Sequence, residues 1–318
     1  MSRIKRKKEL DSPVNTDVRF GTPKEVAEYR AERLKGYDTI IEVGAGAGFQ
    51  TEAFAHNARV VAIDIDAERL GRANLPENVT PIAGDALDPG VMTKAKSAAN
   101  GKTAVFLDPE RPPSSKSRTL DEIKPDINKF IMEYSGIAED IAIELPPFLN
   151  DIPAECEREF LSVEGKLNRL TVYFGELKRC DVSVVRLPSK QRVEHNGPLP
   201  YLEETSVRPR FIGEPDAALT HAGLTPLALP QRYQGLPGRK PTFLLEEEHK
   251  HPFLKLYRIV ASGEKKVRDA LIRCNTLVLH GDMSPQEQRE MLRSLNRFCK
   301  GRARMHLFPD WHLAITVE

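Results

Sequence analysis

The most constraining feature of the chain is a glycine-rich turn between two apolar runs. The segment Ile40–Thr51 reads IIEVGAGAGFQT, and the apolar run that follows it ends in an acid at Asp64. A strand that ends in a carboxylate, turns through glycines and enters a helix is typical of a nucleotide-type cofactor site at the carboxyl ends of parallel strands. The pattern therefore predicts a parallel α/β sheet built around this turn.

The spacing of the glycines separates two kinds of cofactor site. A dinucleotide fingerprint has glycines at positions one, three and six, because the pyrophosphate must reach the N-terminus of the helix. Counted from Gly44, the sixth position is Phe49, whose side chain would block that approach. The turn, with Gly44, Gly46 and Gly48 after Glu42, instead resembles motif I of the class I S-adenosylmethionine-dependent methyltransferases. The predicted cofactor is therefore S-adenosylmethionine and not NAD.

Strand and helix signals alternate through the first half of the chain. A helix is expected from Pro23 to about Leu34, and strands are expected at 39–43, 59–63, 80–83, 103–107 and 141–144. Alternation with short loops implies a doubly wound parallel sheet. Residues 157–174 alternate in hydropathy around a Glu164-Gly165 turn, which predicts an antiparallel hairpin. The predicted fold class is α/β, with a Rossmann-like methyltransferase sheet closed by this hairpin.

The remaining chain is interpreted as two further regions. Residues 186–248 are rich in proline and glycine and are expected to form a connector. Residues 249–318 carry 13 Lys and Arg against 7 Asp and Glu, and their pattern predicts a small α+β domain of order βαβαββ. The expected organisation is a basic tail over 1–20, a cofactor-binding domain over 21–185, the connector, and this C-terminal domain.

Composition narrows the classes of function. The chain has 47 basic and 46 acidic residues, so any attraction for nucleic acid must be local to one part of it. The four cysteines are far apart and lack zinc spacing, which predicts reduced thiols, a cytoplasmic protein and no metal. No apolar run approaches the length of a membrane span, and no secretory signal is expected. The basic run within residues 1–10 is either a solvated tail or an RNA contact.

The motif I resemblance implies a role for each acid that follows a strand. Glu42 is expected to pair with the ammonium group of the cofactor, and Gly44, Gly46 and Gly48 let the backbone approach its amino-acid half. Asp64 is expected to accept the ribose hydroxyls. Asp85 follows the third strand, where this class binds the adenine amino group. The alternative for each carboxylate is a helix cap.

The fourth expected strand ends in the motif Asp108-Pro109-Glu110-Arg111. It resembles the Asn/Asp-Pro-Pro-aromatic motif of methyltransferases that act on exocyclic amines, although Glu110 and Arg111 replace the second proline and the ring. The resemblance implies that Asp108 contacts both cofactor and acceptor. Phe148 is either a substitute stacking ring or part of a rigid loop.

Direct methyl transfer is expected because a nucleophile is missing. RNA-modifying enzymes that attack a pyrimidine ring carry a cysteine after the fifth strand, and this chain has Glu144-Leu145-Pro146-Pro147-Phe148 there. Transfer to a nitrogen or oxygen remains. The candidate catalytic carboxylates are Asp108, Glu110 and Glu144.

Nearly the whole chain resembles one family, the class I methyltransferases with a C-terminal THUMP-like domain. The motifs that carry the resemblance are 25–34, Asp108-Pro109-Glu110-Arg111, FIGEPDAA at 211–218, LVLHGD at 277–282 and MHLF at 305–308. The N-terminal half also resembles trimethylguanosine synthase, through 20–23 and 62–66, but lacks its aromatic strand-four motif. The resemblance implies an RNA substrate, with tRNA as the expected class.

A basic stripe near the C-terminus gives partial support to an RNA partner. The residues predicted to contact RNA recur at helical spacing or follow the helix, namely Arg289, Arg293, Arg297, Lys300 and Arg302. The alternative is a solvated face balanced by Glu287 and Glu290. Two other functions stay open at this point: a small-molecule or protein methyltransferase, and a non-catalytic RNA-binding protein that retains the fold. The oligomeric state is not predicted.

Overall fold

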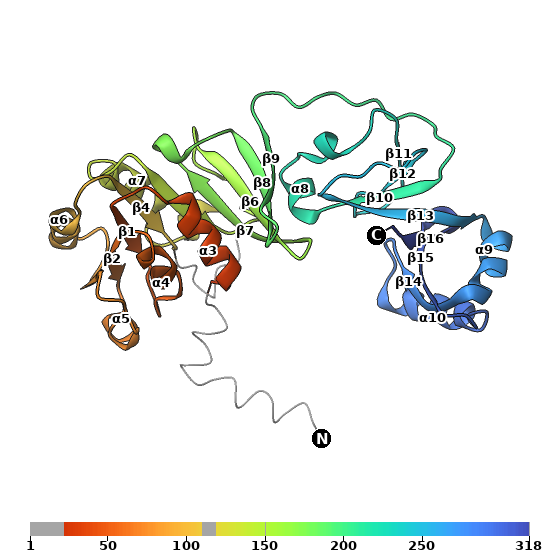
Figure 1. The fold of residues 1–318 in the computed structure, drawn as a ribbon, viewed down its shortest axis with the longest axis horizontal. Helices are drawn as coiled ribbons and strands as arrows, with labels where there is room; N and C mark the ends of the chain where they lie inside the picture. Colours follow the sequence, from red (N-terminus) through yellow and green to blue (C-terminus); the bar gives the residue numbers. More distant parts are fainter. Residues whose placement is uncertain (1–21, 110–118, 150, 318) are drawn as a thin grey trace, which may run out of the picture. The chain divides into compact units, whose positions relative to one another are not determined.

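The computed structural model describes residues 22–109, 119–149 and 151–317, and these form two compact units (Figure 1). The first unit comprises the chain up to Val163 together with Asn168–Glu194. The second comprises Glu164–Leu167 and His195–Glu318. Each unit is built on its own sheet. The predicted basic tail over 1–20 and the candidate residue Glu110 lie outside the described residues.

The first unit is a sheet whose strands follow the order β3-β2-β1-β4-β5-β7-β6-β8-β9. Neighbours among β1 to β5 run parallel, and β7 lies antiparallel to β5, so the predicted fold class is confirmed. The strands are β1 Thr39–Val43, β2 Arg59–Asp64, β3 Val79–Ala83, β4 Thr103–Leu107, β5 Ile141–Leu145, β6 Glu157–Val163, β7 Lys166–Tyr173, β8 Val182–Leu187 and β9 Gln191–His195. The helices are α3 Lys24–Arg33, α4 Phe49–Ala55, α5 Ala67–Arg72, α6 Pro89–Ala98 and α7 Ile127–Tyr134.

Strand register brings the predicted site residues to one edge of this sheet. Val43 of β1 pairs with Ile63 of β2 and with Leu107 of β4, so the two neighbours of β1 end at the same level. All five residues of β1 are buried, as expected for a parallel strand covered on both faces. Phe54 of α4 packs edge-to-face on Phe106 of β4, with ring centroids 5.2 Å apart. This packing holds the helix after the glycine turn against the central strands.

The second unit is a sheet of order β11-β12-β10-β13-β16-β15-β14. Its strands are β10 Phe211–Pro215, β11 Gln234–Gly235, β12 Phe243–Leu245, β13 Leu254–Ser262, β14 Cys274–Leu279, β15 Ala303–Phe308 and β16 His312–Thr316. Its helices are α8 Ala217–His221, α9 Glu264–Ala270 and α10 Pro285–Asn296. β14 and β15 run parallel and are connected through α10, whereas β16 pairs antiparallel with both β13 and β15.

The segment 186–248 differs from the connector that its prolines suggest. It contributes β9 to the first sheet and β10, β11 and β12 to the second. Between the prolines stand apolar residues that the second unit buries, including Ile212, Leu244 and Leu245. Burial of these apolar side chains stabilises the folded state, whereas an exposed linker would leave them in water. The C-terminal segment of the second unit therefore begins at His195 and not at residue 249.

Candidate functional site

The glycine turn has the backbone that its sequence requires. Gly44, Gly46 and Gly48 have φ angles of 82°, 55° and 85°, a region that residues with a Cβ rarely adopt. A Cβ on Gly44 would lie 2.2 Å from the carbonyl oxygen of Asp108. The amide of Asp108 donates to the carbonyl of Val43 at 2.9 Å. The turn and the end of β4 are therefore in direct backbone contact.

Asp64 holds this turn in place. One of its carboxylate oxygens accepts from the amide of Gly46 at 2.7 Å, and the other accepts from the amide of Asp66 at 2.8 Å. The side chain is almost fully buried at the end of β2. Asp66 itself caps α5, accepting from the amides of Glu68 and Arg69. A structural role for Asp64 is thus observed, and its contact with a ribose stays a prediction.

Asp85 lies in the loop after β3 and is exposed. Its Oδ1 accepts from the amide of Leu87 at 2.9 Å. Behind it, the hydroxyl of Tyr134 donates to the carbonyl of Ala86 at 3.0 Å and so ties α7 to the loop. The loop is positioned by β3 and α7 beside the carboxyl edge of the sheet.

Glu42 is the most unusual carboxylate of the site. It is only 1% exposed, and its Oε2 has no hydrogen-bond partner among the described residues. Burial raises the pKa of Glu42 to about 8, and the nearby charges of Asp108 and Asp64 act in the same direction. A buried carboxylate with an unpaired oxygen lowers the stability of the folded protein, and it suits a ligand that brings a cation.

Arg30 of α3 is a site residue that the sequence interpretation missed. Its guanidinium is fully buried, forms an ion pair with Glu144 of β5 and donates to Gln50 of α4 at 3.4 Å. It also lies 5.2 Å from the centroid of the Phe106 ring. Arg30 therefore connects α4, β4 and β5, the elements that carry the glycine turn and the candidate acids. Its one sequence signal is an arginine within an apolar helix face.

Glu144, predicted as a catalytic carboxylate, lies between two arginines. One oxygen pairs with Arg30, and the other lies 2.6 Å from Nε of Arg169 on β7. Both oxygens are thus engaged, which favours a role for Glu144 in joining α3 to the hairpin.

The two other candidate residues of this edge are accessible. Asp108 is half-buried at the end of β4, and Phe148 is 46% exposed in the loop after β5. The catalytic roles of Asp108 and Glu144 stay predictions.

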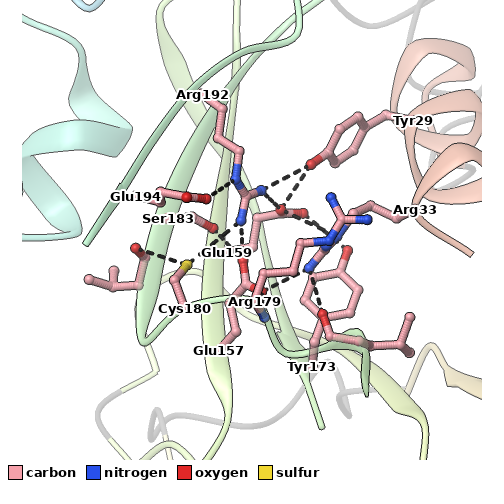
Figure 2. A network of polar contacts seen from close by, with 12 residues as sticks. Tyr29, Arg33, Glu157, Glu159, Tyr173, Arg179, Cys180, Ser183, Arg192 and Glu194 are labelled. Carbon is pink, nitrogen blue, oxygen red and sulfur yellow. Dashed lines mark hydrogen bonds and ion pairs between the residues drawn. The ribbon is translucent and has the colours of Figure 1, made fainter. Parts of the chain in front are cut away.

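A second ionic network joins α3 to the far strands of the first sheet, as Figure 2 shows. Glu157 and Glu159 on β6 are completely buried. Glu157 accepts from Arg33 at 2.9 Å and from Ser183 at 2.7 Å. Glu159 accepts from the hydroxyls of Tyr29 and Tyr173, at 2.8 and 3.0 Å, and Arg192 of β9 pairs with both glutamates. No local pattern in the sequence predicted this network, because its members come from five separate elements.

The predicted RNA-contacting residues lie on the surface of the second unit. Arg289 and Arg293 on α10 are exposed, as are three residues that follow in the chain: Arg297, Lys300 and Arg302. The acids thought to balance them are used elsewhere. Glu287 completes the capping box with Ser284, and Glu290 accepts from Gln286 at 3.0 Å. Within the described part of the chain, neither acid forms an ion pair with these arginines.

Comparison with known proteins identifies the fold. No protein-family model matches the chain, and no curated protein does. A solved structure of a candidate methyltransferase from Porphyromonas gingivalis W83 is similar over 95% of this chain and 81% of its own, with a TM-score of 0.69 and 14% identity. The strand order β3-β2-β1-β4-β5-β7-β6 agrees with that likeness. The chain has the class I methyltransferase fold.

Two other solved structures match part of the chain. A methyltransferase from Aquifex aeolicus matches 54% of this chain and 96% of its own, with 18% identity and a TM-score of 0.31. Precorrin 8w decarboxylase from Methanobacterium thermoautotrophicum matches 48% and 91%, with 15% identity and a TM-score of 0.31. These scores are too low to add to the inference.

Within residues 22–109, 119–149 and 151–317, no group of three His, Cys, Asp or Glu side chains is placed to hold a metal ion. None of the helices in these ranges is long and apolar enough to cross a membrane.

Proposed function

We propose that the protein is an S-adenosylmethionine-dependent methyltransferase. The observation that carries the proposal is the buried Glu42, which has an unpaired oxygen and stands near the end of β1, two residues before the turn of Gly44, Gly46 and Gly48 in a methyltransferase-type sheet. Ligands of open α/β sheets bind at this edge. The cofactor's amino-acid half carries the ammonium group that the carboxylate of Glu42 lacks as a partner. The residues present therefore fit this cofactor.

Each candidate residue has a defined task in this proposal. Glu42 binds the ammonium group, directly or through water, and the glycine turn lets the backbone come close. Asp64 and Asp85 accept hydrogen bonds from the ribose and the adenine amino group. When bound, S-adenosylmethionine supplies an activated methyl group. Asp108 orients the acceptor and takes its proton, because it ends β4 next to the turn.

We further propose that the acceptor is a nitrogen or oxygen of an RNA nucleotide, with tRNA as the expected class. The exposed basic residues on and after α10 support an anionic partner. The loop after β5 has no cysteine, which supports direct transfer. The assignment of the second unit to the THUMP-like class belongs to this proposal.

The test is methyl transfer from labelled S-adenosylmethionine into bulk RNA taken from a strain that lacks this protein. Wild type should label RNA, and Asp108→Ala should lower the rate by at least a hundredfold, in line with the loss of a positioned acid–base group. Asp121→Ala, which changes an exposed acid on the same unit, is the matched control. Nucleoside mass spectrometry then identifies the modified atom.

Three other results would contradict parts of the proposal. Label in proteins or metabolites but not in RNA would show that the acceptor is not RNA. Cofactor binding without transfer to any acceptor would support a non-catalytic RNA-binding protein. Failure to bind S-adenosylhomocysteine would overturn the cofactor assignment itself.

A further inference from the structure

The second unit contains a cavity of about 370 Å³ at the ends of its two parallel strands. Its walls come from the loops that follow β14 and β15, together with α10 and residues 237–238. The amide of His280 donates to the carbonyl of Leu307 at 2.8 Å, so the two loops leave the sheet side by side. The carboxyl ends of parallel strands joined by a helix are a common place for ligands. The volume lies within the range of small-ligand pockets.

Four aromatic or thioether side chains line part of this cavity, namely those of Met283, Met291, Phe308 and Trp311. The ring of His280 stacks on Phe308 at 4.1 Å with an interplanar angle of 20°, which makes one wall rigid. Asp310 and Trp311 both have left-handed backbones, with φ of 57° and 56°. Strained residues at a loop tip persist where the surrounding structure requires them, and they often mark a binding site.

The polar groups of the cavity are carboxylates and a neutral imidazole. Asp282 and Asp310 line it and are exposed, so its mouth is negative. Asp282 accepts from the amide of Arg239 at 2.6 Å, which fixes its position. Burial lowers the pKa of His280, and its ring is uncharged near pH 7. Such a site repels a phosphate and accepts hydrogen bonds from amino groups.

We infer that this cavity binds an unpaired nucleobase that carries an exocyclic amine. The flat ring packs against Trp311 and the methionines, and the amine donates to Asp282 or Asp310. The inference rests on the proposed RNA acceptor. It assigns the second unit a base-reading site, distinct from the phosphate contacts expected of the basic residues on α10.

The chain offers a direct probe, because Trp311 is its single tryptophan. Tryptophan fluorescence is followed as adenosine, guanosine, cytidine or uridine is added to the full-length protein. Saturating S-adenosylhomocysteine is present, so that the cofactor site is occupied. Saturable quenching is expected for the three amine-bearing nucleosides, with at least fivefold weaker binding of uridine. Asp282→Asn and Asp310→Asn should each weaken adenosine binding at least fivefold.

Asp269→Asn on α9 is the matched control and should bind like wild type, because Asp269 does not line the cavity. Absence of saturable quenching by every nucleoside up to the millimolar range would overturn the inference with wild type alone. Equal quenching by all four, unchanged in both cavity variants, would overturn the recognition of the amine. The methyl-transfer assay with Asp108→Ala is separate, so loss of either activity can be told from loss of the other.

Discussion

At the scale of single residues, the buried carboxyl of Glu42 lowers the stability of the protein at neutral pH and is also the proposed contact to the cofactor. Its carboxyl keeps a proton in the folded protein up to about pH 8, whereas its ordinary pKa is 4.5. The folded state thus binds more protons between these values, and Glu42 contributes stability at low pH that is lost as the pH rises towards 8. Because the buried carboxyl of Glu42 lowers the stability of the protein near neutral pH, we expect it to be retained for binding a ligand.

Glu42→Gln should separate the two effects. The amide cannot ionise, so the free energy of unfolding should fall less between pH 5 and 8 than in wild type. Binding of S-adenosylhomocysteine should weaken by roughly tenfold to a hundredfold, since a charge-assisted contact is lost. Thermal unfolding at several pH values measures the change in stability, and calorimetric titration measures the affinity for S-adenosylhomocysteine. Glu52→Gln, exposed on α4, is the control, and equal ligand affinity in Glu42→Gln and wild type would contradict the assigned contact.

Arg30 shows how one buried cation supports a carboxylate on a neighbouring strand. Arg30→Met should lower the free energy of unfolding by about 3 kcal/mol, because it leaves Glu144 short of a partner in a buried setting. Arg30→Lys keeps the charge but not the forked geometry, so its loss should be smaller. Denaturant unfolding checks both. Arg72→Met, which removes an exposed pair with Glu68, should cost under about 1 kcal/mol, and a similar loss in both methionine variants would refute the role of Arg30.

At the scale of elements, caps and pairing fix the boundaries that matter. α10 begins at Pro285, with Ser284 as its cap and Glu287 completing the capping box, and a serine followed three residues later by a glutamate favours this start. β1 and β4 occupy the predicted residues without change. α6, β8 and β9 were not predicted. Arg192 of β9 reaches the buried Glu157 and Glu159, so β9 is held by contacts that no local pattern reveals.

Ser284→Ala should weaken α10. The serine accepts from the amide of Glu287, and loss of this cap should lower the free energy of unfolding by about 1 kcal/mol. Ser294→Ala on the same helix should be neutral or slightly stabilising, since alanine is the better helix former. Denaturant unfolding compares the two. A smaller loss for Ser284→Ala than for Ser294→Ala would show that the cap contributes nothing.

At the scale of the whole molecule, charge is divided unevenly along a chain that is nearly neutral. The exposed arginines of α10 belong to the second unit, whereas the candidate cofactor residues belong to the first. With this division, the second unit can bind an anionic substrate while the first unit carries the proposed methyl-transfer chemistry.

RNA affinity should fall steeply as salt rises. If Arg289 and Arg293 each contact a phosphate, the double change to Gln should reduce the slope of log affinity against log salt by about 1.4 to 1.8. Changing Lys265 and Lys266 of α9 to Gln removes the same charge from exposed positions and should leave the slope near that of wild type. Fluorescence anisotropy with labelled tRNA measures it. A slope equal in both double variants would place the RNA elsewhere.

The sequence by itself determined where the first five strands and the glycine turn lie along the chain, because periodicity, glycine spacing and strand-ending acids are local signals. It also placed Asp64 and Asp108 at the edge where the structure brings them together. Only the tertiary structure decided that Arg30 pairs with Glu144, that Glu42 has an unpaired oxygen, and that 195–248 joins the second unit. These depend on contacts between residues far apart in the chain, where burial and charge act through space and leave no periodic mark.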